Sequence, residues 1–191
     1  MNTENKAKCP KHDTGGGPCY CDNVSASGSN DLLSSETGAT FSQDRNYRYS
    51  LWRRWEHNAP YVLFVGLNPS TANENEDDPT IRRCKRFAAD WGFGAIYMAN
   101  LFALRATDPK DMLAHDKPEG VDNDKTLQKL ARGAGVIVCA WGAHGGHKGR
   151  DEYVARLLEA YELKCLGVTK AGKPRHPLYI KADKQLEALG R

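Results

Sequence analysis

The sequence predicts an α/β fold with a four-stranded, mostly parallel sheet between two layers of helices. Short apolar runs, typical of strands buried on both faces, alternate along the chain with amphipathic segments of helical spacing. Gly, Pro, Asn and Asp residues separate these segments, as they do at turns. Such alternation implies right-handed crossover connections between parallel strands. We therefore expect a three-layer α/β/α sandwich, with a β-hairpin added at its N-terminal end.

The first expected element is a polar N-terminal tail, residues 1–36, which is rich in Gly, Ser, Asn and Asp and shows no apolar periodicity. We place this tail outside the main domain, which we assign to residues 37–191. The tail carries four soft ligands that could close a small structural zinc site: Cys9, His12, Cys19 and Cys21. Their spacing matches no strong zinc motif, so a tail that carries reduced thiols is the alternative.

A β-hairpin is expected next, at the start of the domain. In residues 47–52, large apolar side chains alternate with Arg48, Ser50 and Trp52, which is the period of a half-buried strand. Residues 43–46 (QDRN) supply a turn before this strand. We expect the side of the strand that carries Arg48 and Trp52 to face solvent or DNA.

From Tyr61 onward, strands and helices alternate. Residues 77–92 predict the first helix, because Asp residues precede Pro79 in the first turn and Gly92 ends the apolar pattern. Residues 105–122 are interpreted as a loop. The other expected elements are strands at 61–67, 95–104, 135–142 and 163–168, and helices at 123–133 and 150–161. Three cysteines fall on apolar faces and are expected in the core: Cys84, Cys139 and Cys165.

Composition and charge narrow the functional classes. The chain has 191 residues and a formal net charge of +3, which is too small to indicate a polyanionic partner by itself. No apolar run approaches the roughly 20 residues of a membrane-spanning helix. The first residues lack the apolar core of a secretory signal, so we expect a cytoplasmic protein that has no membrane partner. Between Lys164 and Arg191 basic residues outnumber acidic ones, which fits either a solvated face or a phosphate-contacting surface.

The segment VGLNPSTA (residues 65–72) follows the buried strand that begins at Tyr61. Pro69 cannot continue a strand ladder, and it pushes the preceding residue, Asn68, towards an extended conformation. The strand therefore ends there and presents Asn68 at its carboxyl end. In open α/β sheets, ligands bind outside the carboxyl ends of the strands.

Four strand ends together resemble the uracil-DNA glycosylase superfamily. VGLNPST is similar to its first motif, a turn of the form Gly-x-Asp/Asn-Pro, and YMANLFALRA resembles the segment whose Asn reads the flipped base. VIVCAWGAHGGHKG resembles the third-strand stretch that has Trp-Gly and a basic, glycine-rich loop. RHPLY resembles the His-Pro motif after the fourth strand. The four segments stand in the order of that superfamily and span residues 61 to about 180.

A closer resemblance supports the fold more than the chemistry. FSQDRNYRYSLWRRW, GLNPSTA, DDPTIRRC and RHPLY together look like an uncharacterised family of bacterial and phage proteins, a domain of unknown function. That family is thought to share the glycosylase fold, but its description gives no activity.

The resemblance implies a monofunctional DNA glycosylase, a hydrolase that cuts the N-glycosidic bond of a flipped, altered pyrimidine. His176 would stabilise negative charge on a carbonyl oxygen of the leaving base. Asn68 would hold the attacking water, and an amide oxygen orients water without deprotonating it. Asp78 is expected to cap the helix that follows and to place a carboxylate near the cleft. No lysine is positioned as a Schiff-base nucleophile, so strand cleavage is not expected.

Four residues are assigned to base binding. Asn100 lies inside an apolar strand, and its amide either bonds neighbouring backbone or reads the edge of a flipped pyrimidine. Ser70 stands where strict uracil enzymes of that superfamily carry a Tyr that crowds C5 of the base. An open C5 side would admit hydroxymethylated or glucosylated bases of phage DNA, in a defence role. Pro69 shapes the same turn. Phe102 or another ring would stack on the base, because NENEDDPT contains no aromatic residue.

DNA is the expected partner, and no obligate protein partner is implied. The residues assigned to DNA contact are Lys148, Lys170, Lys173 and Arg175, which flank the proposed cleft in loops, and Leu178. Leu178 or Tyr179 would be a wedge in the base stack, and a core position for Leu178 is the alternative. The chemistry requires no cofactor. Two other functions stay open: a catalytically silent nucleic-acid-binding relative, and an enzyme that acts on free nucleotides.

Overall fold

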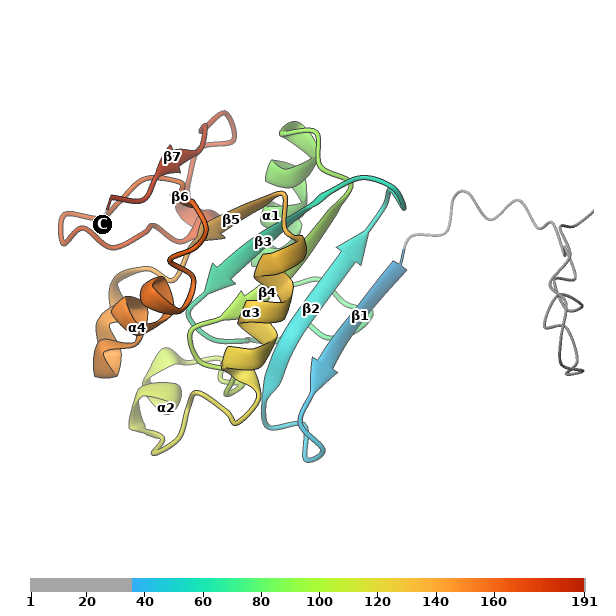
Figure 1. Cartoon of the computed structure of the whole chain (residues 1–191). Coiled ribbons are helices and arrows are strands. Elements are labelled where there is room, and N and C mark those ends of the chain that lie inside the picture. The colour runs from blue at the N-terminus through green and yellow to red at the C-terminus, as the bar shows by residue number, and fades with distance from the viewer. Residues whose placement is uncertain (1–35, 191) are drawn as a thin grey trace, which may run out of the picture. The chain divides into compact units, whose positions relative to one another are not determined.

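A computed structural model describes residues 36–190 of the chain (Figure 1). The main elements, in chain order, are β1 (Glu36–Phe41), β2 (Arg48–Arg54), β3 (Tyr61–Gly66), α1 (Pro79–Asp90), β4 (Ala95–Asn100), α2 (Pro109–Ala114), α3 (Asn123–Gly133), β5 (Val136–Cys139), η1 (Ala143–Gly149), α4 (Arg150–Leu157), β6 (Leu163–Cys165), η2 (Pro177–Tyr179) and β7 (Glu187–Ala188), where η denotes a 3-10 helix. The structure therefore confirms a mixed α/β fold, and β1 begins at Glu36, one residue before the expected domain boundary.

A single sheet runs through the domain, with strand order β1-β2-β4-β3-β5-β6-β7. Its four central strands, β4, β3, β5 and β6, are mutually parallel. The hairpin β1–β2 adds to β4 in the antiparallel sense, and β7 adds to β6 in the same way. The expectation of four strands was therefore wrong in number, because the predicted hairpin joins the main sheet and a two-residue strand closes the other edge (Figure 1).

Helices cover both faces of the sheet. Alternate residues of a strand point to opposite faces, and β3 shows this directly. Val62 and Phe64 pack in one apolar cluster with residues of α1, whereas Leu63 and Val65 pack in a second cluster with residues of α2, α3 and α4. The side chain of Phe64 is fully buried, as is that of Leu63. Burial on both faces explains why the sequence of β3 is apolar without interruption.

Local sequence signals set the ends of the helices. Asp78 caps α1, because its Oδ1 accepts a hydrogen bond from the Ile81 backbone nitrogen at 2.8 Å, and Pro79 occupies the first turn. Gly92 follows α1 with a positive φ of 80°. Residues 105–122 are not wholly a loop: α2 forms there behind an Asp108 cap. Six residues are too few to show a helical period, which is why the sequence did not reveal α2.

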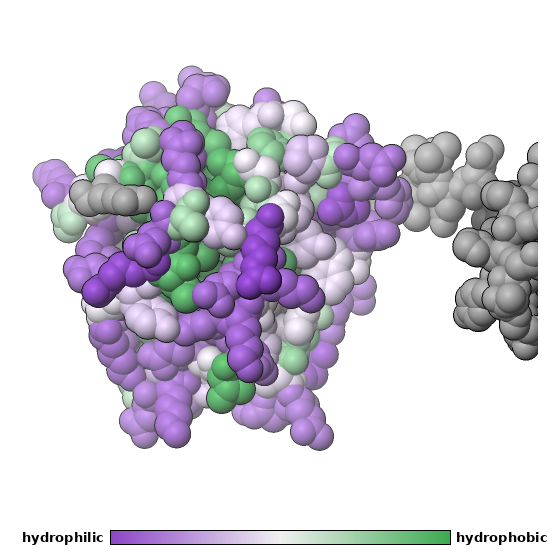
Figure 2. Space-filling view, in the orientation of Figure 1, coloured by the Kyte–Doolittle hydropathy of each residue, from purple (hydrophilic) through white to green (hydrophobic). Residues whose placement is uncertain are grey.

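The surface of the domain is largely hydrophilic on the face turned to the viewer in Figure 2, with apolar patches between projecting polar groups. No helix within residues 36–190 has the length and apolar character needed to cross a membrane. Within residues 36–190, the exposed large hydrophobic side chains are Val121, Tyr153, Val168, Leu178 and Tyr179. Three of these five lie within residues 168–179, next to the basic loop predicted to contact DNA.

Candidate active site

A cavity of about 510 Å³ opens at the carboxyl ends of the central strands. Asn68 reaches it from just beyond β3, and Asn100 reaches it from the last position of β4. Trp141, two residues after β5, and His176, just before η2, complete the lining on the other side. This cavity, which we call the site cavity, also borders Arg48, Ser70 and Asp78. Residues from distant parts of the sequence thus meet at one edge of the sheet, as parallel strands require.

Asn100 carries a buried polar atom without a partner in the described chain at the site cavity. Its side chain is almost fully buried, and its Nδ2 has no hydrogen-bond partner among residues 36–190. The backbone oxygens of Asn100 and Leu101 each accept a hydrogen bond from Asn123 Nδ2 at 3.0 Å, which fixes the end of β4. An unpaired buried amide costs about 1–3 kcal/mol. The hydrogen bond from Nδ2 to neighbouring backbone, one of the two alternatives expected from the sequence, is therefore not formed among residues 36–190.

Gly66 makes room for the Asn100 side chain. The two residues are register partners on the adjacent parallel strands β3 and β4. A Cβ on residue 66 would lie 2.8 Å from Asn100 Oδ1, which is closer than real Cβ atoms approach a neighbour. The glycine of the VGLNPST segment is thus required by the amide that lies beside it.

Asn68 offers an acceptor to the site cavity. Its Nδ2 donates hydrogen bonds to the backbone oxygens of Pro69 at 3.0 Å and Ala106 at 2.8 Å. These two bonds fix the orientation of the amide, so Oδ1 is the atom left for a ligand. No donor within the described residues bonds Oδ1. Pro69 itself does not line the cavity and acts through its backbone oxygen.

His176 is half-buried and keeps a neutral imidazole. Its Nδ1 accepts a hydrogen bond from the Leu178 backbone nitrogen at 3.3 Å, so the proton of the neutral ring resides on Nε2. Burial lowers the pKa of His176 below its ordinary value, and the nearby negative charge of Asp78 opposes this shift. The ring of Tyr179 lies 5.8 Å from the imidazole, centroid to centroid.

Arg48 is a site residue that the sequence did not reveal. It was expected on a face open to solvent or DNA, but its side chain is buried in the wall of the site cavity. Its Nη1 donates to the backbone oxygen of Ala72 at 2.6 Å, and its Nε has no partner within the described chain. Burial lowers the pKa of Arg48 to about 10, and the charge of Asp78 opposes this. Strand alternation separates two faces but does not say which of them another segment covers.

Trp141 adds another unpaired donor to the site cavity. The indole Nε1 is buried and has no hydrogen-bond partner in the part of the chain that is described. A Cβ at Gly145 would lie 2.1 Å from Trp141 Cδ1, so the glycine-rich segment η1 packs directly on the indole. Asn100, Arg48 and Trp141 therefore each carry a buried polar atom that lacks a partner, and all three border one cavity. Buried polar atoms in native proteins normally have a hydrogen-bond partner, so these three residues make the site cavity the candidate site.

Other predicted residues lie in different surroundings. Ser70 lines the site cavity, but Phe102 does not: its side chain is fully buried in the apolar cluster with α3 and α4. Stacking by Phe102 on a base is thus wrong, because protein covers the ring completely; its nearest ring neighbour is His147, at 5.7 Å. Leu178 is 40% exposed, which excludes a core position for it, and Tyr179 is 82% exposed at the rim of the cavity.

The four cations predicted to contact DNA differ in whether other groups of the protein already bind them. Lys148 Nζ donates to the backbone oxygens of His115 and Asp116, and Lys173 Nζ forms an ion pair with Asp151. Arg175 is exposed, and its Nε donates to the Val168 oxygen at 3.0 Å. Lys170 is exposed, and no ion pair to it is formed by residues 36–190. Lys170 and Arg175 are therefore the cations best placed to meet phosphates.

The predicted zinc ligands Cys9, His12, Cys19 and Cys21 lie outside the described residues. Within residues 36–190, no cluster of three or more His, Cys, Asp or Glu residues could hold a metal ion. Cys84, Cys139 and Cys165 are free and buried, as expected. Burial raises the pKa of the Cys84 thiol, so it remains protonated.

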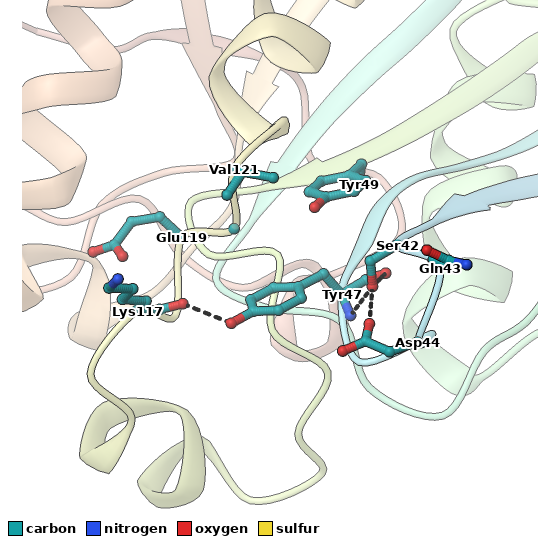
Figure 3. Close-up of a pocket in the computed structure, with 9 residues that line it drawn as sticks. Ser42, Gln43, Asp44, Tyr47, Tyr49, Lys117, Glu119 and Val121 are labelled. Carbon is teal, nitrogen blue, oxygen red and sulfur yellow. Dashed lines mark hydrogen bonds between the residues drawn. The ribbon is translucent and has the colours of Figure 1, made fainter.

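A separate cavity of about 650 Å³ lies at the tip of the β1–β2 hairpin (Figure 3). Tyr47 and Tyr49 stand on one side of it and Val121 on the other. Polar groups there form hydrogen bonds with one another. The Tyr47 hydroxyl donates to the Lys117 backbone oxygen at 3.0 Å, and the Tyr47 backbone nitrogen donates to Ser42 Oγ at 3.0 Å. Because none of its side chains has a buried polar atom in need of a partner among the described residues, we place the candidate active site at the site cavity.

Comparison with known proteins identifies the family. A family profile described as "Protein of unknown function (DUF1643)" matches residues 48–178. Neither the curated proteins nor the solved structures yield a match. The matched range contains Asn68, Asn100 and His176, and it agrees with the resemblance to an uncharacterised family, whereas the resemblance to the uracil-DNA glycosylase superfamily stays a prediction. The chain belongs to the DUF1643 family of proteins of unknown function.

Proposed function

We propose that the chain is a monofunctional DNA glycosylase that hydrolyses the N-glycosidic bond of a flipped, altered pyrimidine. One observation carries the proposal: Asn68, Asn100 and His176, which are far apart in the sequence, border a single cavity. Each residue offers a different atom to a ligand there, namely an amide oxygen, an unpaired amide nitrogen and an imidazole N–H. The resemblance of the four strand-end segments to the uracil-DNA glycosylase superfamily supports the same conclusion.

Asn100 would read the flipped base. A carboxamide presents a donor and an acceptor side by side, which matches the edge of a pyrimidine. Nδ2 has no partner in the free protein, so a base that accepts its hydrogen bond gains this interaction without breaking another. Asn123 holds the end of β4 through two backbone oxygens and so keeps the reading side chain in place.

His176 would stabilise the leaving base. As the glycosidic bond breaks, its electron pair passes to the base and negative charge develops on a carbonyl oxygen. A neutral imidazole with its proton on Nε2 donates a hydrogen bond to that oxygen, and the lowered pKa keeps the ring neutral. One donor of this kind can contribute roughly 3 kcal/mol to stabilising the transition state.

Asn68 would position the water. Its Oδ1 accepts a hydrogen bond from a water whose oxygen forms the new bond to C1′ of the sugar, while the bond from C1′ to the base nitrogen breaks. The base leaves as an anion with the electron pair of the broken bond, and the proton that the water loses after the attack neutralises the base. An amide is a poor base, so deprotonation follows rather than drives the attack, and slow turnover is expected. Asp78 lines the cavity, and its carboxylate supplies negative charge for the cationic sugar.

The size of residue 70 suggests which pyrimidine is excised. Ser70 is a small side chain in the wall of the site cavity, so it leaves room beside a bound base. We propose that bases substituted at C5, including hydroxymethylated and glucosylated bases of phage DNA, enter there. The enzyme would then act in defence, with Lys170 and Arg175 on the phosphates and Leu178 or Tyr179 in the base stack.

The test is to incubate the full chain with duplexes that carry uracil, a thymine mismatch, hydroxymethylated cytosine or glucosylated cytosine. Mass spectrometry then detects the released base, and alkaline cleavage detects the abasic site. His176→Ala and Asn68→Ala are the matched inactive variants. Inertness on every duplex, together with retained DNA binding, would favour the silent nucleic-acid-binding alternative. Release of base from mononucleotides, with duplexes left intact, would favour an enzyme that acts on free nucleotides.

A further inference from the structure

A second cavity of about 320 Å³ adjoins the site cavity. The two share Ser70, Ala106 and Thr107 in their linings, so these residues form the partition between them. We call the second one the side cavity; its polar lining residues are Arg45, Asn46, Ser70, Thr71, Arg105 and Thr107. The two cavities are therefore neighbours, so groups of one ligand could occupy both.

The chemistry of the side cavity is that of an anion site. Its lining has three hydroxyl groups, one carboxamide and two guanidinium groups, and within the described residues no carboxylate lines it. Arg45 is engaged in an ion pair with Glu74 at 2.8 Å on the outer side. Arg105 forms no direct ion pair with any residue from 36 to 190, although the Glu74 carboxylate that pairs with Arg45 is near enough to feel its charge.

Arg105 is held in place but retains free donors. Its Nη1 donates to the backbone oxygen of Arg45 at 3.0 Å, and its guanidinium carbon lies 5.2 Å from the centre of the Phe41 ring. Its Nε is buried and lacks a hydrogen-bond partner in the described chain. A fixed guanidinium that still has donors to give is well suited to a tetrahedral oxyanion.

Arg48 adds to the positive potential at the partition. It lines the site cavity, as Ser70 does, and burial first and the charge of Arg105 in addition lower the pKa of Arg48. Two like charges that repel one another across a partition are both stabilised when an anion binds between them. Both arginines also carry a buried Nε without a partner among residues 36–190.

We propose that the side cavity is a phosphate-binding subsite, which holds the phosphate of the nucleotide whose base occupies the site cavity. The phosphate oxygens would accept hydrogen bonds from Arg105 and from the hydroxyls of Ser70, Thr71 and Thr107. Such a contact positions the nucleotide without reading its base. The inference rests on the proposed function for the identity of the base, but the phosphate itself comes either from a DNA backbone or from a free nucleotide.

The test measures binding, so it does not depend on base release. The probe is a fluorescent duplex that contains a tetrahydrofuran abasic analogue, with either natural phosphodiesters or one neutral methylphosphonate on its 5′ or 3′ side. For the wild-type chain, one of the two methylphosphonates is expected to weaken binding about tenfold, the loss typical of a hydrogen bond to a charged group. Arg105→Gln is expected to weaken binding of the natural duplex about tenfold, with no further loss from that methylphosphonate.

Two further variants control this measurement. Arg86→Gln removes one positive charge from the exposed face of α1, where Arg86 is 68% exposed, and should leave the methylphosphonate effect intact. Arg105→Lys keeps the charge and should retain part of the effect. Thermal melting of each variant checks that the fold is preserved.

A second arm compares deoxyuridine 5′-monophosphate with deoxyuridine. We call an effect of the phosphate that disappears in Arg105→Gln coupling to Arg105. If the nucleotide binds more tightly than the nucleoside to the wild type but not to Arg105→Gln, and the duplexes show no such coupling, the subsite is supported and its phosphate is that of a free nucleotide. Absence of coupling to Arg105 in both arms overturns the subsite, including the case in which the side cavity takes a substituent of the base. Coupling to Arg105 without base release supports the subsite and contradicts the proposed function. Base release without coupling to Arg105 supports the proposed function and contradicts the subsite.

Discussion

Gly66 and Asn100 are paired across β3 and β4, and Asn100 Oδ1 occupies the space in which a Cβ of residue 66 would stand, at 2.8 Å. The smallest residue of the first strand end thus sets the position of the amide at the second. Steric fit between neighbouring strands, rather than a hydrogen bond, keeps the Asn100 side chain at the cavity.

Replacement of Gly66 by Ala should displace the Asn100 amide. The added methyl group cannot remain 2.8 Å from Oδ1, so the amide must rotate away from the base it is proposed to read. We expect base release to fall at least tenfold, which corresponds to about 1.4 kcal/mol. Gly190→Ala is the control, because a Cβ there meets no atom within 4 Å. Wild-type rates in Gly66→Ala would contradict the proposed role of Asn100.

Asn100→Leu should stabilise the free protein and abolish activity. The buried Nδ2 has no partner within the described residues, so an apolar side chain of similar size removes an unmet hydrogen bond. We expect the free energy of unfolding to rise by about 1 kcal/mol, measured by urea denaturation. A variant that is less stable and still active would show that Asn100 serves the fold and not a ligand.

The pH dependence of base release should show a neutral His176. Its pKa lies below the ordinary value of 6.5, chiefly because of burial. Activity should therefore persist below pH 6.5 and decline only as pH falls through the lowered pKa. The unfolded chain takes up the proton first, so the contribution of His176 to stability is constant above about pH 6.5 and is lost below it. His176→Asn should remove this loss of stability, and an unchanged profile in unfolding experiments would refute the assignment.

Arg53 should be essential for stability but not for the chemistry. It is buried, its Nε donates to Asp77 Oδ1 at 2.7 Å, and its Nη2 donates to the Asn73 oxygen at 2.7 Å. Arg53→Met leaves Asp77 with one ion-pair partner, Lys85, and should cost about 3 kcal/mol of unfolding free energy. Arg86→Gln breaks a surface pair with Asp90 and should cost less than about 1 kcal/mol, so it serves as the control.

The salt dependence of DNA binding should separate the lysines near the site. Lys170→Ala should reduce the slope of log affinity against log salt by about 1, because Lys170 is exposed and free to meet a phosphate. Lys173→Ala should change the slope less, because its ammonium group is already paired with Asp151. Equal changes in both variants, measured by titration at several salt concentrations, would contradict this distinction.

Much of the fold follows from sequence periodicity. Continuous apolar runs locate β3, β4 and β5, and the Asp78 cap with Pro79 locates the start of α1. Short elements were not predicted, because the six residues of α2 and the two of β7 are too few for a period to repeat. The number of strands was not predicted for a related reason: periodicity identifies a hairpin but does not show that its second strand, β2, pairs with β4 of the main sheet.

The sequence predicted the site residues that stand at strand ends. It did not predict those whose side-chain direction or burial depends on tertiary packing. Asn68 and Asn100 share an edge because β3 and β4 are parallel neighbours. Phe102 lies just beyond the same strand end, yet its ring turns into the core, since a position in the chain does not fix a side-chain direction. Arg48 was overlooked because only the folded chain shows that its face of β2 is covered and that its guanidinium reaches the cavity.

The three central residues of the site cavity lie on two kinds of structure. Asn68 and Asn100 stand at the ends of two hydrogen-bonded neighbouring strands in the middle of the sheet. His176 lies on the segment 169–179, in which the Pro174 oxygen accepts a hydrogen bond from the Gly142 nitrogen at 2.9 Å. Displacing that one segment would widen the entrance and withdraw the imidazole at the same moment. Entry of a nucleotide and placement of the imidazole beside the leaving base would then be coupled. The open pocket would lack the contact to the leaving base, so hydrolysis would require the closed one.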